Sequence, residues 1–307
     1  MLRRSRRQLK FRADRHRSGS TLPCGGRRWS TAVGGDGLGR ISAKPPAGAL
    51  SRLRWYRLIT FGDDKLRGGS GDDELYGDSF EGNASIFSFT AGGNDRLCGG
   101  NGNDLIIGDS QTMSAFGEDS SVIGGDDRLS GGNGNDQLFG DSDLGGAVEL
   151  SSFVGGNDVL KASNGNDLLI GDSRTVSAIE GSSVMGGNDT LNGGKGNDFI
   201  VGDFQFASAV GASTVIGGND IMTGGRGDDA FLFLTGSRMD IITDFEAGAG
   251  SDDVLDVTDY GIDGTNFESV LEEDIDGNAV LAFNADDRIT LWGVDGDSLD
   301  FDDFVTI

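Results

Sequence analysis

The sequence predicts an all-β protein: a parallel β-roll of stacked coils, with a small C-terminal β cap and a disordered N-terminal leader. Two observations predict the roll. Glycine accounts for 54 of the 307 residues and apolar residues for only 36 %, so a large conventional core is not expected. A unit of 31 or 32 residues recurs through the middle of the chain. A repeat of this length indicates a solenoid, because each unit must stack on its neighbours to bury its apolar face.

Charge and pattern divide the chain into three parts: a basic leader (1–60), a repeat region (61–233) and a β-rich cap (234–307). The first 58 residues carry 15 Lys and Arg against two acidic residues, whereas the rest carries 10 against 48. An acid-rich body argues against nucleic-acid partners and anionic membranes, and for cations. Because the sequence has no run of 18 apolar residues, membrane insertion is not expected.

The basic leader has several interpretations. Residues 5–10 resemble a twin-arginine export motif, but the residues that follow lack the apolar stretch that an export peptide needs. A disordered leader, a misread start or frame, and a nucleic-acid-binding arm remain open. Cys24 and Cys98 lie far apart in the sequence, and two free thiols are expected.

Six units fill the repeat region, and the second reads GGNDRLCGGNGNDLIIGDS (92–110). Each unit holds two nonapeptides of the form G-G-x-G-x-D-x-U-x, where U is a large apolar residue such as Leu97 or Ile106. The glycines favour turns, because they adopt positive φ and allow the backbone to approach an ion closely. The residues after each Asp are expected to form a short strand with U pointing inward. Two strands and two turns would then make one coil.

One turn of each coil is tight, and the other carries about a dozen extra residues, for example 111–123 and 174–185. These inserts share a Ser-Ala-apolar core and are expected to form a regular flap along one edge. The tight-turn aspartates are Asp73, Asp104, Asp136, Asp167, Asp198 and Asp229. The aspartates nine residues earlier, on the side of the inserts, are Asp64, Asp95, Asp127, Asp158, Asp189 and Asp220.

Stacked coils would arrange these aspartates in columns, about 4.8 Å apart from coil to coil. At an effective dielectric near 20, two carboxylates at ~5 Å repel by about 3 kcal/mol, so the columns need cations. Carboxylates and turn carbonyls are hard oxygen ligands, and the one histidine, His16, cannot build a usual zinc site. Flexible, carbonyl-rich loops suit Ca²⁺ better than octahedral Mg²⁺. The twelve aspartates are therefore predicted to hold Ca²⁺, and ion binding is predicted to supply folding energy.

For the insert side, capping of polar turns remains the alternative to ion binding. The same alternative applies to the aspartates of the Gly-Asp-Ser and Gly-Asp-Phe motifs, which are Asp109, Asp141, Asp172 and Asp203.

The nonapeptides resemble those of the RTX family of secreted bacterial proteins. The resemblance covers residues 61 to about 233 and implies a Ca²⁺ ion between successive turns. Asp side chains and backbone carbonyls, for example of Gly100, Asn101 and Gly102, would coordinate it. The fourth unit departs from the pattern, because Ala162-Ser163 replaces Gly-Gly, and full occupancy of that turn is in question.

Beyond Leu234 the repeat stops, and residues 239–245, 253–257, 279–283 and 288–292 are predicted to form strands between Asp/Gly turns. This block is similar to the C-terminal cap of serralysin-type RTX proteins, which implies a type I secretion signal and a secreted, extracellular protein. Asp240 and Asp244 are expected to have turn roles rather than to add an ion site.

The function expected from these features is calcium binding by a secreted roll that folds on Ca²⁺ after export and is not an enzyme. Its expected partners are calcium ions, the type I secretion apparatus and a cell-surface or glycan target. One histidine cannot build the H-E-x-x-H motif of a zinc protease, and no G-x-S-x-G motif lies at a strand-to-helix junction. The alternatives are the C-terminal fragment of a secreted RTX hydrolase or protease, and a surface adhesin.

Overall fold

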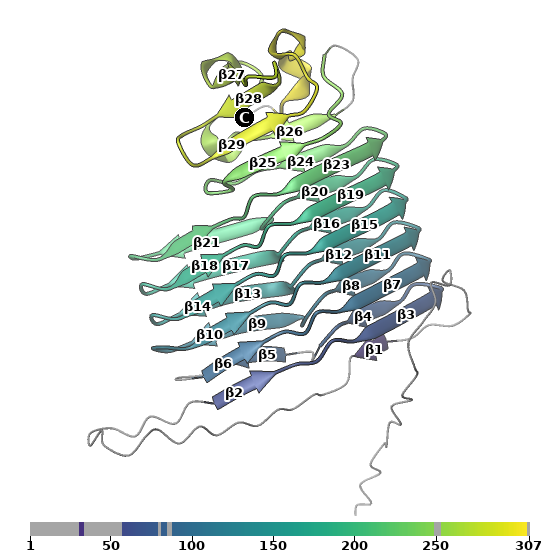
Figure 1. The fold of residues 1–307 in the computed structure, drawn as a ribbon, viewed down its shortest axis with the longest axis vertical. Helices are drawn as coiled ribbons and strands as arrows, with labels where there is room; N and C mark the ends of the chain where they lie inside the picture. The colour runs from purple at the N-terminus through teal and green to yellow at the C-terminus, as the bar shows by residue number, and fades with distance from the viewer. Residues whose placement is uncertain (1–30, 34–56, 79–80, 85–87, 249–252, 306–307) are drawn as a thin grey trace, which may run out of the picture.

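The computed structural model describes residues 31–33, 57–78, 81–84, 88–248 and 253–305. These residues form a parallel β-solenoid with four short 3-10 helices, so the predicted all-β parallel roll is confirmed (Figure 1). In the part of the chain that is described, no helix is long and apolar enough to cross a membrane. Of the leader, only β1 (Thr31–Val33) and β2 (Arg57–Thr60) are described; the disorder predicted for the rest lies outside the described residues.

Each complete coil contributes one strand to each of four sheets, and the strands of successive coils pair in parallel. Sheet I contains β3 (Lys65–Ser70), β7 (Arg96–Asn101), β11 (Arg128–Asn133), β15 (Val159–Asn164), β19 (Thr190–Lys195) and β23 (Ile221–Arg226). Sheet II contains β1, β4 (Glu74–Tyr76), β8 (Leu105–Ile107), β12 (Gln137–Phe139), β16 (Leu168–Ile170), β20 (Phe199–Val201) and β24 (Ala230–Leu232). Sheet III contains β5 (Glu81–Ala84), β9 (Thr112–Phe116), β13 (Ser142–Val148), β17 (Ser173–Ile179) and β21 (Phe206–Val210). Sheet IV contains β2, β6 (Ser88–Ala91), β10 (Ser121–Ile123), β14 (Ser152–Val154), β18 (Ser183–Met185) and β22 (Thr214–Ile216).

The apolar residues of the repeats set the register of the first lobe, which sheets I and II form. Leu97 on β7 lies opposite Leu129 on β11, and Ile106 on β8 lies opposite Leu138 on β12. These four side chains are buried, as predicted, because alternate residues of a strand point to the same face. A slip of one residue would turn every one of them outward, so the repeated pattern permits one register.

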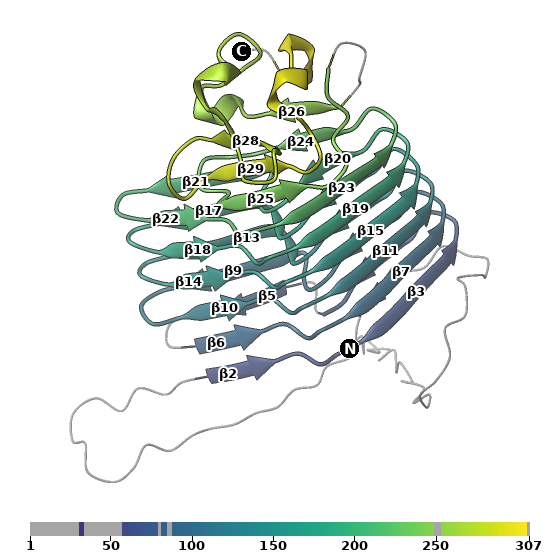
Figure 2. The same ribbon diagram turned by 45° about the horizontal axis from the view of Figure 1, so that its top comes forward.

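The inserts differ from the predicted edge flap. In each coil the insert forms two further strands, for example β9 and β10, so a coil has four strands and not two. Met113, Ala115 and Val122 point inward and are buried with their counterparts in other coils. Packing sheet III against sheet IV buries the apolar face that this alternation creates. Sheets III and IV therefore form a second lobe with its own core, beside the first (Figure 2).

One prediction about the cysteines is wrong. Cys98, on β7, is disulfide-bonded and is not a free thiol. The prediction rested on sequence separation, which does not limit the residues that folding brings together. Cys24, the other cysteine of the sequence, lies outside the described residues.

The C-terminal segment continues the first lobe and then closes it. Strand β25 (Met239–Ile242) pairs in parallel with β23, and β26 (Val254–Asp256) pairs in parallel with β24. Sheet I then ends with β29 (Arg288–Leu291), β28 (Ala279–Ala282) and β27 (Leu271–Glu273), the last two pairings being antiparallel. The 3-10 helices are η1 (Thr258–Tyr260), η2 (Phe267–Ser269), η3 (Gly296–Ser298) and η4 (Phe301–Asp303). Among the described strands, sheets III and IV end at β21 and β22, so this segment extends the sheets of the first lobe alone.

Candidate metal centre

The predicted tight-turn aspartates form a row where sheet I turns into sheet II. Their carboxylates bridge the coils. Asp104 Oδ1 accepts a hydrogen bond from the amide nitrogen of Asp73 at 2.8 Å, and Asp136 Oδ1 accepts one from Asp104 at 2.8 Å. The same contact recurs at Asp167, Asp198 and Asp229. All six aspartates are at most 3 % exposed, so the structure brings the predicted tight-turn residues together in one buried row.

The second carboxylate oxygen of these aspartates lies against a glycine of its own turn. A Cβ on Gly99 would stand 2.1 Å from Asp104 Oδ2, and one on Gly131 would stand 2.3 Å from Asp136 Oδ2. Only glycine leaves room for the carboxylate at these positions. Neither Oδ2 atom has a hydrogen-bond partner in the described part of the chain. Because a buried charged oxygen without a partner is costly, this row favours binding of a cation.

The predicted carbonyl ligands of the second unit lie in the same turn. Gly100 and Gly102 have φ angles of +124° and +132°. A Cβ on either would stand 2.2 Å from a carbonyl oxygen of the preceding coil, that of Gly69 or of Gly71. The carbonyl oxygen of Asn101 accepts a hydrogen bond from the amide of Gly71 at 2.7 Å. The glycine carbonyls therefore point from coil to coil along the row of aspartates.

The fourth unit departs from this arrangement. Ala162 is buried in the core of the first lobe, and it carries a Cβ where its counterpart Gly131 leaves room for the carboxylate of Asp136. Ser163 has a φ of +97°, a conformation that glycine adopts with less strain. This turn keeps the backbone shape of the others and fills part of the space beside its aspartate, Asp167.

The predicted aspartates of the insert side lie at the waist, the strip between the two lobes. Asp64 is partly exposed, whereas Asp95 and its counterparts in the later repeat coils are at most 1 % exposed. Each Oδ1 atom accepts a hydrogen bond from the amide of the equivalent Asp one coil earlier, as Asp127 does from Asp95 at 2.6 Å. The contact recurs at Asp158, Asp189 and Asp220.

A second row of aspartates, from the Gly-Asp-Ser and Gly-Asp-Phe motifs, faces the first across the waist. Its members are Asp78, Asp109, Asp141, Asp172 and Asp203, all at most 6 % exposed. Each accepts a hydrogen bond from the second glycine of a Gly-Gly-Asn-Asp or Gly-Gly-Asp-Asp turn, as Asp109 Oδ2 does from Gly125 at 2.9 Å. Sequence analysis missed Asp78, although aligning the units places it where the second unit has Asp109.

Three groups of waist carboxylates converge closely enough to share one ion, with one oxygen per residue within 4.8 Å of the others. They are Asp64 with Asp78 and Asp95, Asp95 with Asp109 and Asp127, and Asp203 with Asp220 and Asp240. Among the described residues the tight turns form no such group. An ion at a tight turn would therefore need carbonyl oxygens as well as carboxylates.

Burial and like charges make these carboxylates hard to ionise. Burial, followed by the negative charges of Asp78 and Asp64, raises the pKa of Asp95 to about 7. Burial and the charges of Asp127 and Asp141 raise the pKa of Asp109 well above its ordinary value. In the tight-turn row, burial raises the pKa of Asp136 to about 7. Without a cation, both rows favour protons near neutral pH.

The C-terminal segment continues the insert-side row and the tight-turn row. Asp240 Oδ1 accepts a hydrogen bond from Asp220, and Asp253 Oδ1 accepts one from Asp229, both at 2.9 Å. Sequence analysis expected a turn role for Asp240, which instead belongs to a waist group, and did not single out Asp253. Asp244 accepts hydrogen bonds from two glycine amides of the last tight turn, which agrees with its expected turn role.

The donor atoms fit Ca²⁺. All three waist groups consist of aspartates alone, and Ca²⁺ takes six to eight oxygen ligands in flexible geometry. The buried oxygens without partners supply the negative charge that such an ion neutralises. An ion in these rows would crosslink successive coils.

Comparison with known families accounts for the repeats. The model of the RTX calcium-binding nonapeptide repeat matches residues 60–81, 89–112, 124–143, 154–173, 184–205 and 217–232. The search of curated proteins found no match. The matched segments contain the strands of the first lobe in every unit, whereas most of the second lobe lies between them.

Proposed function

Since the chain belongs to the RTX calcium-binding nonapeptide repeat family over residues 60–232, and binds Ca²⁺ through its β-roll, we propose that it is a secreted, non-catalytic protein that folds on Ca²⁺ after export. One observation carries the proposal: the aspartate rows are buried, and carboxylate oxygens such as Asp104 Oδ2, Asp136 Oδ2 and Asp127 Oδ2 have no hydrogen-bond partner among the described residues. The carboxylates of these rows repel each other until a cation neutralises their charge. Ion binding and folding are then one event.

The proposed ligands of the repeat sites are the predicted aspartates together with turn carbonyls. At the second tight turn these are Asp104 and the carbonyls of Gly100, Asn101 and Gly102. The burial of Asp104 and the coil-to-coil direction of the glycine carbonyls support this assignment.

The Ca²⁺ concentration that folding requires implies that the chain is exported before it folds. Extracellular modules of this affinity class bind Ca²⁺ at roughly 10⁻⁴ to 10⁻³ M, so the acidic chain stays unfolded until it meets an external concentration of this order. Residues 234–307 are proposed to carry the type I secretion signal and to close the first lobe. The partners are then calcium ions and the type I apparatus.

A calcium titration of the full chain, followed by circular dichroism, tests folding on the ion. We expect a change to β signal in millimolar Ca²⁺ and none in millimolar Mg²⁺, because Mg²⁺ demands octahedral geometry and keeps its water. A roll that stays ordered in excess chelator at neutral pH would contradict the proposal.

A secretion assay tests the role of the C-terminal segment. Deletion of residues 234–307 should abolish export from a host that carries a type I apparatus. Deletion of the second unit, residues 92–123, is the matched control and should leave export intact. Equal export of both variants would contradict the secretion signal.

A surface adhesin is the second candidate, and the outer face of sheet III favours it. Phe116, Leu144, Phe206 and Val210 are each at least 45 % exposed there. An exposed apolar face on a soluble protein marks a binding surface. Binding of the calcium-loaded protein to a glycan array, lost on Phe116→Ser and Phe206→Ser, would support this candidate.

A further inference from the structure

We propose that the waist holds a second file of Ca²⁺ sites, whose ligands include the Gly-Asp-Ser and Gly-Asp-Phe aspartates and whose ions close the base of the second lobe. The inference rests on the proposed calcium binding and extends it. These sites differ from the tight-turn sites, because each waist ion would be shared by two successive aspartates of one row and a third aspartate from the facing row.

The group around Asp109 carries the argument. Asp95, Asp109 and Asp127 place one oxygen each within 4.8 Å of the others. They are 0 %, 0 % and 1 % exposed. Asp109 Oδ1, Asp95 Oδ2 and Asp127 Oδ2 have no hydrogen-bond partner in the described part of the chain. Three buried carboxylates with unpartnered oxygens are a stable arrangement only with positive charge between them.

A carbonyl oxygen stands beside two of these carboxylates, those of Asp95 and Asp127. The point where Gly77 would carry a Cβ is 1.7 Å from the carbonyl oxygen of Gly108 and 1.9 Å from Asp95 Oδ2. The same point on Gly108 is 1.8 Å from the carbonyl oxygen of Gly140 and 2.0 Å from Asp127 Oδ2. Two acceptors therefore face the same small space. A cation accommodates this pairing, because both oxygens can be its ligands.

In the two facing rows of turns, the carboxylate of one turn lies over a glycine of a turn in the other row. The last aspartate of a Gly-Gly-Asn-Asp or Gly-Gly-Asp-Asp turn places its carboxylate over the glycine of a Gly-Asp-Ser motif, as Asp127 does over Gly108. The aspartate of a Gly-Asp-Ser motif in turn places its carboxylate over the first glycine of such a turn, as Asp141 Oδ1 does 1.8 Å from the Cβ position of Gly124. Any side chain at these glycines would displace a carboxylate, so the glycines keep the site open.

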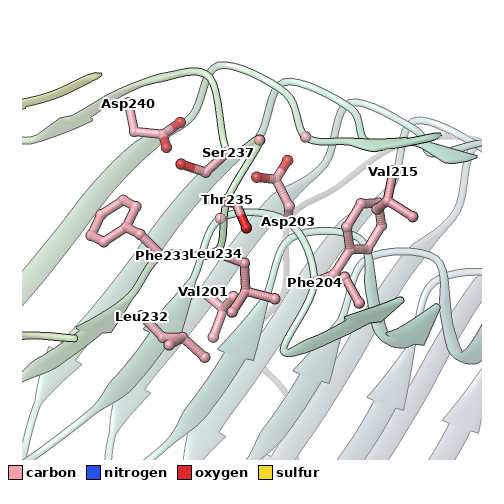
Figure 3. Close-up of a pocket in the computed structure, with 14 residues that line it drawn as sticks. Val201, Asp203, Phe204, Val215, Leu232, Phe233, Leu234, Thr235, Ser237 and Asp240 are labelled. Atoms are coloured by element: carbon pink, nitrogen blue, oxygen red, sulfur yellow. The ribbon is translucent and has the colours of Figure 1, made fainter. Parts of the chain in front are cut away.

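The upper end of the waist repeats the arrangement with a ligand from beyond the repeats. Asp203, Asp220 and Asp240 form the group, and the Oδ2 atoms of Asp220 and Asp240 lack partners among the described residues. Figure 3 shows the side chain of Ser237 between Asp203 and Asp240. Here β25 supplies the last carboxylate, so the file ends where the second lobe ends.

The position of these ligands in the chain gives the ions their role. Asp109 lies shortly before β9 and Asp127 shortly after β10, so the two residues flank the two strands that one coil contributes to the second lobe. Asp203 and Asp220 flank β21 and β22 in the same way. An ion shared by both flanking residues closes the loop between them and removes closure entropy from the second lobe. The second lobe should therefore depend on the waist ions and the first lobe should not.

A matched pair of double variants tests the inference on the full chain. Asp109→Asn with Asp203→Asn removes waist ligands, and Asp104→Asn with Asp198→Asn removes tight-turn ligands of the same two coils. Asn keeps the shape and a carbonyl acceptor while it removes the charge. Calorimetric Ca²⁺ titration counts the ions, and hydrogen exchange in saturating Ca²⁺ reports on each strand.

The waist variant should bind two fewer Ca²⁺ ions than the wild type, one for each altered group. It should lose exchange protection in β9, β10, β21 and β22 while β7 and β8 stay protected. The tight-turn variant should also lose ions but keep the protection of the second lobe. If the double variant does not fold, Asp109→Asn alone should lose one ion and protection in β9 and β10.

An unchanged ion count in the waist variant, or equal loss of protection in both lobes, would overturn the inference. A wild-type chain that binds no Ca²⁺ would overturn the proposed function instead. The two failures are thus distinguishable.

Discussion

Asp127 Oδ1 lies 2.6 Å from the amide nitrogen of Asp95, which stands 32 residues earlier in the chain. The same hydrogen bond links successive coils along the insert-side row and the tight-turn row. Each of these carboxylates therefore accepts a hydrogen bond from the preceding coil and also carries a charge that must be neutralised. Removing the acceptor and removing the charge should therefore have different effects.

Two substitutions of Asp136 separate these effects. Asp136→Ala leaves the buried amide of Asp104 without an acceptor, and should lower the free energy of unfolding in Ca²⁺ by about 1–3 kcal/mol beyond the lost ion. Asp136→Asn keeps an acceptor and removes a repulsive charge, so in chelator, where the wild type is expected to be unfolded, it should retain more β signal. Urea unfolding in Ca²⁺ and circular dichroism in chelator measure the two effects. Equal behaviour of the two variants would show that the hydrogen bond contributes little.

A side chain at Gly132 is predicted to lower stability. Its φ is +127°, and a Cβ would stand 2.1 Å from the carbonyl oxygen of Gly100 in the preceding coil. Gly132→Ala combines strain with a backbone clash and should cost more than about 2 kcal/mol. Gly211→Ala is the control, because Gly211 has a φ of +76° and no atom within 4 Å of its Cβ position, and it should cost about 1 kcal/mol. Equal losses in urea unfolding would mean that strain, not contact between coils, selects glycine.

Ser163→Gly should stabilise the protein. Ser163 has a φ of +97° in the place where the neighbouring units have Gly132 and Gly194. Glycine at this position relieves about 1 kcal/mol of backbone strain. Calcium-saturated thermal unfolding should show a higher midpoint for the variant, and a lower midpoint would indicate that the Ser163 side chain makes a contact worth more than the strain.

Stability without calcium should fall as pH rises. Burial raises the pKa of Asp95, Asp136 and Asp198 from 3.8 to about 7 in the folded chain. Because the pKa of these groups is higher in the folded chain than in the unfolded chain, the folded chain holds their protons more tightly. This contribution to stability is fully present below the pKa of the unfolded chain and is lost as pH rises through about 7. In chelator, the chain should therefore show more β signal by circular dichroism at pH 5 than at pH 8.

Saturating Ca²⁺ should reverse that pH dependence. Ions compete with protons for the same carboxylates, so calcium affinity rises with pH. Calorimetric titrations at pH 5 and pH 8 measure it. A β signal in chelator that is the same at both pH values would show that repulsion between the aspartates does not oppose folding.

The repeat period predicted much of the fold. Leu97, Leu129 and Leu160 recur at the same place in each unit, and stacking identical units places identical residues opposite each other. The all-β roll, its inward leucines and its calcium could therefore be predicted from local pattern. The tight-turn and insert-side aspartates could be predicted as rows for the same reason.

The second lobe could not be predicted, because the apolar residues of the short inserts alternate over only a few positions, as at Met113 and Ala115, and their core forms only when sheet III packs on sheet IV. For the same reason, the sequence did not predict that Asp109 lies close to Asp95 and Asp127. Their spacing in the chain reveals a shared site only when β9 and β10 fold back and bring both ends of the insert to the waist. The sequence by itself thus determined which residues repeat and which ion they suit, since both follow from composition and period. Only the tertiary structure decided which carboxylates face each other, because that depends on how the inserts close.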